Sequence, residues 1–317
     1  MREGRLLVGW GTATTTYPVF RAPASARVRL MPDGTAEVET AASDMGPGTY
    51  TSMTQVAADA LGLSPKAVSF RLGRSDFPPT PPHGGSMTMA SVGSAVQAAC
   101  LAARDQAVGR AIADDRSALR GASAESVEVR DGRLSLRDDR SRGHSYAELV
   151  ALGAGQPIEA EASSAGGDER QRYSMHAFGA VFAEVVVDPD LGMVRVRRAV
   201  GAYGAGRIVN PRLAHSQCIG GMVGGIGMAL MEQTVLDPRD GRPVNASMAD
   251  YLVPVNLDIG ALDALFVEEH DPYVNPLGVK GLGEIALVGM APAIANAVFH
   301  ATGRRVRDLP IRIENLL

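Results

Sequence analysis

Cysteine is scarce in this 317-residue chain, which contains only Cys100 and Cys218, in unrelated sequence contexts. Two isolated thiols provide neither a disulfide framework nor the ligand set of a zinc site. Aromatic residues are also few, at 5% of the chain, whereas glycine occurs 36 times and methionine 13 times. This composition predicts helices that pack closely through small side chains.

An excess of charge of one sign is absent too. The chain has 31 Lys and Arg residues against 35 Asp and Glu residues, and the basic residues are scattered. A nucleic-acid-binding surface needs clustered basic residues, so we expect no nucleic-acid partner. With 45% hydrophobic and 21% charged residues, the composition is typical of a globular protein long enough for two domains.

The N-terminal residues carry charge and no long apolar stretch, which predicts no signal peptide on this chain. Residues 219–231 are apolar but contain five glycines and are shorter than the roughly 20 residues that span a bilayer. We therefore expect no membrane span, and a cytoplasmic location or a periplasmic one after export with a signal-bearing partner.

Strand and helix patterns alternate along the chain. Residues 6–17 predict a Thr-rich strand, and residues 180–187 and 193–199 predict a hairpin of long strands. Asn210 before Pro211 predicts the start of a helix, with Asn210 as the N-cap.

The composition of residues 163–167 is that of a linker and divides the chain into residues 1–165 and residues 166–317. Each half alternates strands with helices. The charged stretch of residues 104–142 predicts exposed periphery without chemistry.

Four loops contain the glycines Gly46, Gly84, Gly204 and Gly278, and each precedes a helical pattern. A glycine turn that opens onto a helix offers free N–H groups to a phosphate or another polar oxygen, although many such turns only cap helices. None of the four matches the phosphate-binding GxxxxGK[ST] loop or a strand-anchored GxGxxG.

The loop of residues 278–284 has three glycines and ends in one carboxylate, Glu284. Its glycines allow close backbone approach to a bulky group, and the carboxylate suits a general base. The residues alone leave two interpretations open, a cofactor clamp with a base and an ordinary turn with a solvated glutamate.

Two further features each have two explanations. The helix that follows Pro211 contains Gly220, Gly221, Gly224 and Gly225, each about 1 kcal/mol less favourable than alanine. Tight packing against another backbone, or against a flat ligand, would compensate for this loss of helix stability.

Arg21 lies in an apolar segment framed by prolines and is either a substrate or cofactor neighbour or a surface arginine.

Seven short motifs follow one another in order: Val8-Gly9-Trp10-Gly11, Asp44-Met45-Gly46-Pro47-Gly48-Thr49-Tyr50-Thr51, Gly84-Gly85-Ser86, Ala90-Ser91-Val92-Gly93, Arg207-Ile208-Val209-Asn210-Pro211, Gln217 with Gly220-Gly221, and Gly278-Val279-Lys280-Gly281-Leu282-Gly283-Glu284. Together they resemble the molybdenum-binding subunit of the xanthine dehydrogenase/aldehyde oxidase family. The chain looks similar to the bacterial aldehyde oxidoreductases that use molybdopterin cytosine dinucleotide. The resemblance runs from about residue 5 to the C-terminus.

The resemblance implies an α+β fold of two related two-layer α/β subdomains. Residues 1–165 would be the first half of the molybdopterin-binding domain, and residues 166–317 the second half, which carries the glutamate loop. It implies that Glu284 is the catalytic base and that no protein side chain ligates the metal, because the pterin holds it. The implied cofactor contacts are Gly46, Pro47, Gly48, Met89, Ala90, Arg207, Ile208, Val209, Asn210, Pro211, Arg212, Leu213, Gln217, Lys280, Gly281, Leu282 and Gly283.

The implied activity is that of a molybdenum-dependent oxidoreductase that converts aldehydes to carboxylic acids with water as the oxygen source. A purine or N-heterocycle hydroxylase of the same family is the alternative, and a non-catalytic pterin-binding or scaffold half-subunit is the second. The resemblance places iron–sulfur clusters and FAD on partner subunits, a [2Fe–2S] subunit and an FAD subunit.

The chain departs from the family pattern in two ways. Pro47 stands where the family often has glutamine, which removes an amide side chain and a backbone donor. The chain also starts where the family's second molybdenum-binding domain starts, so it is expected to be a split subunit or a fragment. We expect it to be inactive and largely cofactor-free until the N-terminal molybdenum-binding half complements it.

Overall fold

The computed structural model describes residues 1–317, and internal contacts divide the chain into two units. Unit 1 comprises Met1–Val19, Met175–His270 and Lys280–Leu317, and unit 2 comprises Phe20–Ser174 and Asp271–Val279. Both units combine sheets with helices, as expected for an α+β fold. The units do not follow chain order, because the N-terminal strand joins the sheet of the C-terminal residues. The division into residues 1–165 and residues 166–317 remains a prediction made from the sequence.

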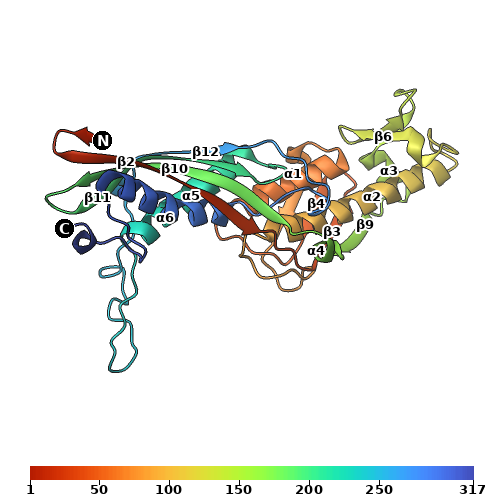
Figure 1. Ribbon diagram of the computed structural model, residues 1–317. Helices are drawn as coiled ribbons and strands as arrows, with labels where there is room; N and C mark the ends of the chain where they lie inside the picture. Colours follow the sequence, from red (N-terminus) through yellow and green to blue (C-terminus); the bar gives the residue numbers. More distant parts are fainter. The chain divides into compact units, whose positions relative to one another are not determined.

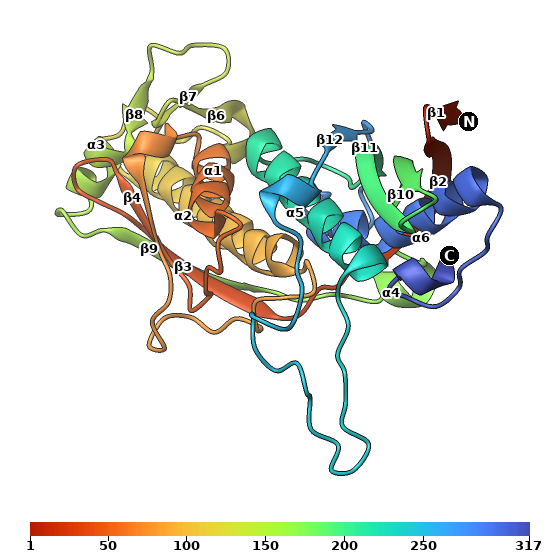
Figure 2. The same cartoon turned by 90° about the vertical axis from the view of Figure 1, so that its left-hand side faces the viewer.

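Unit 1 is a five-stranded sheet with two long helices packed on it (Figure 1). The strand order is β1-β2-β10-β11-β12, and neighbours are antiparallel except for the parallel pair β11 and β12. Its elements are β1 (Arg2–Glu3), β2 (Leu6–Pro18), β10 (His176–Asp188), β11 (Met193–Gly204), α5 (Pro211–Leu230), η4 (Asn256–Asp258), β12 (Ala261–Phe266), α6 (Gly283–Thr302) and η5 (Ile313–Asn315). Between α5 and β12 the chain forms a long loop that extends away from this sheet (Figure 2).

Helix α6 is long and apolar enough to cross a membrane, judged by length and composition alone. In the structure it packs against β2, β10 and α5. Ile285, Met290 and Ile294 on its inner face are completely buried in the core of unit 1. We therefore assign α6 as a core helix.

Glycines in α5 bring it within backbone distance of α6. A Cβ added at Gly221 would lie 2.4 Å from the carbonyl oxygen of Gly283, and one at Gly225 would lie 2.4 Å from the Cβ of Met290. Tight packing against another backbone is therefore the explanation that the structure supports for these two glycines. Gly220 is different, because a Cβ there would meet nothing within 4 Å.

Unit 2 is built on a four-stranded sheet of order β5-β4-β3-β9, with β4 and β5 parallel and the other pairs antiparallel. Helices α1 and α2 pack on this sheet, and a small sheet β6-β7-β8 lies near α3 (Figure 2). Its elements are β3 (Ala24–Leu30), β4 (Ala36–Glu39), α1 (Thr49–Leu61), η1 (Pro65–Ala67), β5 (Val68–Arg71), η2 (Met89–Gly93), α2 (Ser94–Ala113), η3 (Ala124–Ser126), β6 (Val127–Arg130), β7 (Arg133–Leu136), β8 (Gly143–Ser145), α3 (Tyr146–Leu152), β9 (Ile158–Ser164) and α4 (Glu169–Arg172).

The charged stretch of residues 104–142 is only in part the exposed periphery that its composition predicted, with residues 137–142 all exposed. Helix α2 continues through it to Ala113, and Ala107, Ala111, Leu119 and Leu134 are completely buried. In α2, Ala107 and Ala111 recur at helical spacing and are buried, while Arg110 between them is half-buried and donates from Nη1 to the carbonyl oxygen of Leu149 at 3.2 Å.

Candidate active site

Glu284 lies in the first turn of α6, directly after the glycine loop, and its side chain is half-buried. The N-cap residue, Leu282, provides no side-chain hydrogen bond to the helix. Backbone N–H groups of this turn therefore remain for other partners, and the positive end of the helix dipole favours a negative charge here.

Strand β2 ends beside this carboxylate. The hydroxyl of Tyr17 donates a hydrogen bond to Glu284, and burial first and then this bond raise the pKa of Tyr17 to about 12. Two residues earlier, Thr15 Oγ1 donates to the carbonyl oxygen of Ile285 at 2.8 Å. No motif in the sequence marked Tyr17, because its partner lies more than 260 positions away along the chain.

Lys280 is buried, with 4% of its side chain exposed, and its ammonium forms an ion pair with Glu269 at 2.5 Å. The other carboxylate oxygen of Glu269 accepts a hydrogen bond from the backbone N–H of Gly206 at 3.0 Å. The N–H of Lys280 donates to the carbonyl oxygen of Ala205, also at 3.0 Å. These contacts join the glycine loop that precedes α5 to the loop that precedes α6, and sequence reasoning missed Glu269.

The start of α5 follows the expected pattern. Asn210 is the N-cap, its side-chain oxygen accepts a hydrogen bond from the N–H of Leu213 at 3.0 Å, and Pro211 occupies the first helical turn. The remaining implied contacts of this segment lie at the start of α5 or just before it. They are Arg207, Ile208, Val209 and Arg212, with Gln217 two turns into the helix.

In unit 2, the loop before α1 is shaped by positive φ angles at Gly46 (109°) and Gly48 (85°). The carboxylate of Asp44 accepts hydrogen bonds from the N–H groups of Gly46 at 2.8 Å and Thr49 at 3.1 Å. A Cβ added at Gly46 would meet nothing within 4 Å, so this loop borders open space. Pro47, between the two glycines, contributes no N–H to it.

Arg21 is partly buried and is therefore not an ordinary surface arginine. Its Nη2 donates to Ser164 Oγ at 2.6 Å, whereas its Nε is buried without a hydrogen-bond partner. Burial lowers the pKa of Arg21, with the Glu169 carboxylate opposing the effect. The next residue, Ala22, donates its N–H to Ser91 Oγ at 3.0 Å, which brings this segment to the π-helical turn that contains Met89 and Ala90.

The residues present fit an anionic organic cofactor. In unit 1, α6 begins without a side-chain cap. In unit 2, Gly46 borders open space, and Arg21 carries an unsatisfied buried N–H. Such donors suit phosphate and pterin oxygens. No group of three or more His, Cys, Asp or Glu side chains is placed to hold a metal ion.

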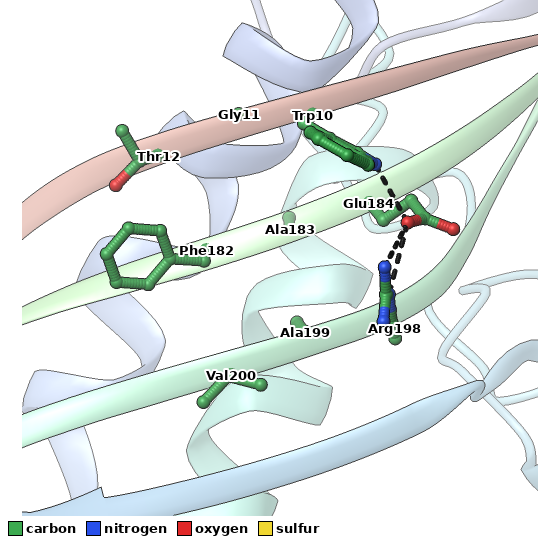
Figure 3. A pocket seen from close by; sticks show the side chains of 9 residues that line it. All are labelled: Trp10, Gly11, Thr12, Phe182, Ala183, Glu184, Arg198, Ala199 and Val200. Carbon is green, nitrogen blue, oxygen red and sulfur yellow. Dashed lines mark hydrogen bonds and ion pairs between the residues drawn. The ribbon is translucent and has the colours of Figure 1, made fainter.

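A separate hollow of about 400 Å³ lies on the sheet of unit 1 and contains none of the predicted site residues (Figure 3). Trp10, Phe182 and Arg198 line it, and Glu184 accepts hydrogen bonds from Trp10 Nε1 and Arg198 Nη2, both at 2.8 Å. Burial raises the pKa of Glu184, but the hydrogen bonds from Arg198 and Trp10 outweigh it, and the pKa lies below its usual value.

Residues 1–260 match the family described as the molybdopterin cofactor-binding domain. The chain therefore belongs to this family, as found in molybdenum-binding subunits of the xanthine dehydrogenase/aldehyde oxidoreductase type. It is 40% identical over 317 residues to the aldehyde oxidoreductase molybdenum-binding subunit PaoC of Escherichia coli O157:H7, covering all of this chain and 41% of PaoC. The loop of residues 278–284 lies outside the family match but within this alignment.

A second relative is the putative xanthine dehydrogenase molybdenum-binding subunit XdhA of Escherichia coli K12, at 30% identity over 326 residues. That alignment covers 99% of this chain and 42% of XdhA. The crystal structure of quinoline 2-oxidoreductase from Pseudomonas putida 86 superposes with a TM-score of 0.88 at 24% identity, over 98% of this chain and 41% of that one. This similarity confirms the fold.

Proposed function

We propose that the chain is the base-carrying part of a molybdenum hydroxylase that oxidises aldehydes to carboxylic acids with water as the oxygen source. The observation that carries this proposal is the half-buried carboxylate of Glu284, placed at the start of α6 after a glycine loop and hydrogen-bonded by Tyr17. The 40% identity to the molybdenum-binding subunit of an aldehyde oxidoreductase supports the aldehyde class of substrate.

The overall reaction consumes one aldehyde and one water and yields one carboxylic acid, two electrons and two protons. When bound, the molybdenum cofactor supplies the two-electron oxidation. Glu284 acts as the general base and accepts the proton of the water-derived oxygen as that oxygen forms its bond to the aldehyde carbon.

The cofactor contacts implied by the resemblance belong to this proposal. In unit 1 they are the residues before and within the first turns of α5 and the loop before α6, and in unit 2 they are the loop before α1 and the turn at Met89 and Ala90. We propose that the pterin is in the cytosine dinucleotide form, and that Arg21 binds an anionic group of the cofactor or the substrate through its unsatisfied Nε.

Further protein parts complete the enzyme in this proposal. The chain spans about 41% of the length of PaoC. We propose that the remaining part of a molybdenum-binding subunit, a [2Fe–2S] subunit and an FAD subunit assemble with it and carry the two electrons away.

A purine or N-heterocycle hydroxylase is the second candidate, and the 30% identity to XdhA is the observation that favours it. The test is to produce the chain together with the remaining part of a molybdenum-binding subunit, purify the assembly and compare turnover of an aromatic aldehyde with turnover of xanthine in H₂¹⁸O. We expect aldehyde turnover with ¹⁸O in the acid. Turnover of xanthine alone would establish the second candidate, and a molybdenum-loaded assembly that oxidises neither compound would refute both.

A further inference from the structure

Strand β2 holds the first turn of α6 through two side chains on one face of the strand. Thr15 Oγ1 donates to the carbonyl oxygen of Ile285 at 2.8 Å, and the hydroxyl of Tyr17 donates to the carboxylate of Glu284. Residues two apart in a strand point to the same side, so both contacts come from the face that packs on the helix. All four residues belong to unit 1.

The register of β2 on α6 is set by close backbone packing further along the strand. A Cβ added at Gly11 would lie 2.2 Å from the carbonyl oxygen of Ala293, nearly three turns into the helix. Only glycine permits this approach, and a shift of the strand along the helix would break it. The position of Tyr17 relative to Glu284 is therefore fixed by the packing of the whole element and not by the glycine loop.

The hydroxyl of Tyr17 acts as a donor throughout the working range of pH. Its pKa is raised to about 12, so the phenol stays protonated near neutrality. An ionised carboxylate offers about four acceptor positions, and one hydrogen bond leaves the others available. Tyr17 can thus hold Glu284 without occupying the lone pairs that a base needs.

We propose that Tyr17 is a positioning residue for Glu284, fixing the rotamer of its carboxylate while a free lone pair receives the proton from the water-derived oxygen. The inference rests on the proposed function, because Glu284 must be the base for Tyr17 to affect the reaction. The physical reason is that a glutamate at a junction between loop and helix has three rotatable bonds, and misplacement of a base by about 1 Å costs about 100-fold in rate.

The first experiment compares Tyr17→Phe with wild type in the assembled, molybdenum-loaded enzyme. We expect kcat to fall about 10-fold or more while KM changes less, because the carboxylate loses the donor that fixes its rotamer. Two matched controls separate this from general damage. Thr15→Val removes the neighbouring hydrogen bond from β2 to the backbone of α6. Tyr251→Phe removes another tyrosine–glutamate hydrogen bond, from Tyr251 to Glu232 at 3.2 Å.

The second experiment needs neither cofactor nor turnover. NMR of the full chain labelled at the tyrosine Cζ carbons is recorded up to about pH 10.5, where exposed tyrosines ionise. We expect the Tyr17 signal, assigned by its loss in Tyr17→Phe, to remain that of a protonated phenol in wild type. In Glu284→Gln the pKa of Tyr17 should fall but stay above that of exposed tyrosines, because burial, the larger cause of the shift, remains.

The outcomes separate this proposal from the proposed function. A kcat in Tyr17→Phe equal to that of wild type, or an equal loss of kcat in Thr15→Val, would overturn the positioning role, as would a Tyr17 signal that titrates like those of exposed tyrosines. If Glu284→Gln kept full turnover, the base assignment itself would be wrong, and the positioning role would fall with it. The NMR result would then still report whether the hydrogen bond exists.

Discussion

Lys280 and Glu269 form an ion pair in which the ammonium is buried, with 2.5 Å between Nζ and Oε1. The pair joins two loops that flank the proposed base, because Glu269 also accepts the N–H of Gly206. A buried ammonium without its carboxylate is costly, whereas a pair of apolar side chains of similar volume is often tolerated.

We therefore expect Glu269→Leu to lower the free energy of unfolding by about 3 kcal/mol, because it removes a carboxylate that compensates the buried charge of Lys280. The double variant Glu269→Leu/Lys280→Met should lose much less. Urea unfolding of the wild type, both single variants and the double variant measures the coupling. A double variant as unstable as the sum of the single variants would show that the two side chains do not act as a pair.

The glycines of α5 give a second prediction. Gly221→Ala should lower the free energy of unfolding by about 1–3 kcal/mol, because its Cβ would fall 2.4 Å from the carbonyl oxygen of Gly283. Gly220→Ala, at the adjacent position with open space around it, should instead raise stability by up to about 1 kcal/mol. Thermal unfolding of the two variants provides the measurement, and equal effects would contradict the close packing of α5 on α6.

The third prediction concerns pH and Glu184. Its pKa is lowered in the folded protein, so the interactions of its carboxylate stabilise the fold above the unfolded value of about 4.3, and this stabilisation is lost as pH falls through the folded pKa. Glu184→Gln should therefore be less stable than wild type by about 1.5 kcal/mol at pH 7, and the difference should shrink below about pH 4. Urea midpoints between pH 3 and pH 7 test this, with the exposed Glu268→Gln as the control. A difference that stays constant with pH would contradict the assigned interactions.

Arg21 provides the fourth prediction. Because its buried Nε lacks a partner, Arg21→Gln should reduce either the molybdenum content of the assembled enzyme or its affinity for substrate by about 10-fold. The control is Arg27→Gln, which removes an arginine paired with Glu161 on the sheet of the same unit. Metal analysis and KM measurements compare the two variants, and identical behaviour would mean that Arg21 binds no anionic group.

Local features of the fold could be predicted from the sequence because their physical causes are local. Asn210 before Pro211 predicted the start of a helix, and Asn210 is the N-cap of α5. The alternating pattern of β10 and β11 likewise identified a hairpin, which the pairing confirms. In each case the residue types within one element decide the outcome.

The contacts around the candidate site could not be predicted in the same way. Tyr17 meets Glu284 only because β2 pairs with β10 and lies on α6, and Lys280 meets Glu269 only because two loops converge. Both depend on strand pairing and helix packing between distant segments, which periodicity within one element does not encode. The ordered motifs marked the loops, but the side chains that hold these loops became visible only in the structure.

The central claim is that Glu284 is the base of a molybdenum-dependent oxidation. The most direct measurement is aldehyde turnover by the assembled enzyme carrying Glu284→Gln, compared with wild type at equal molybdenum content. Glutamine keeps the size of the side chain and removes its ability to accept a proton, so we predict a loss of about 100- to 10,000-fold in kcat with the cofactor still bound. Turnover equal to wild type at equal molybdenum content would contradict the account.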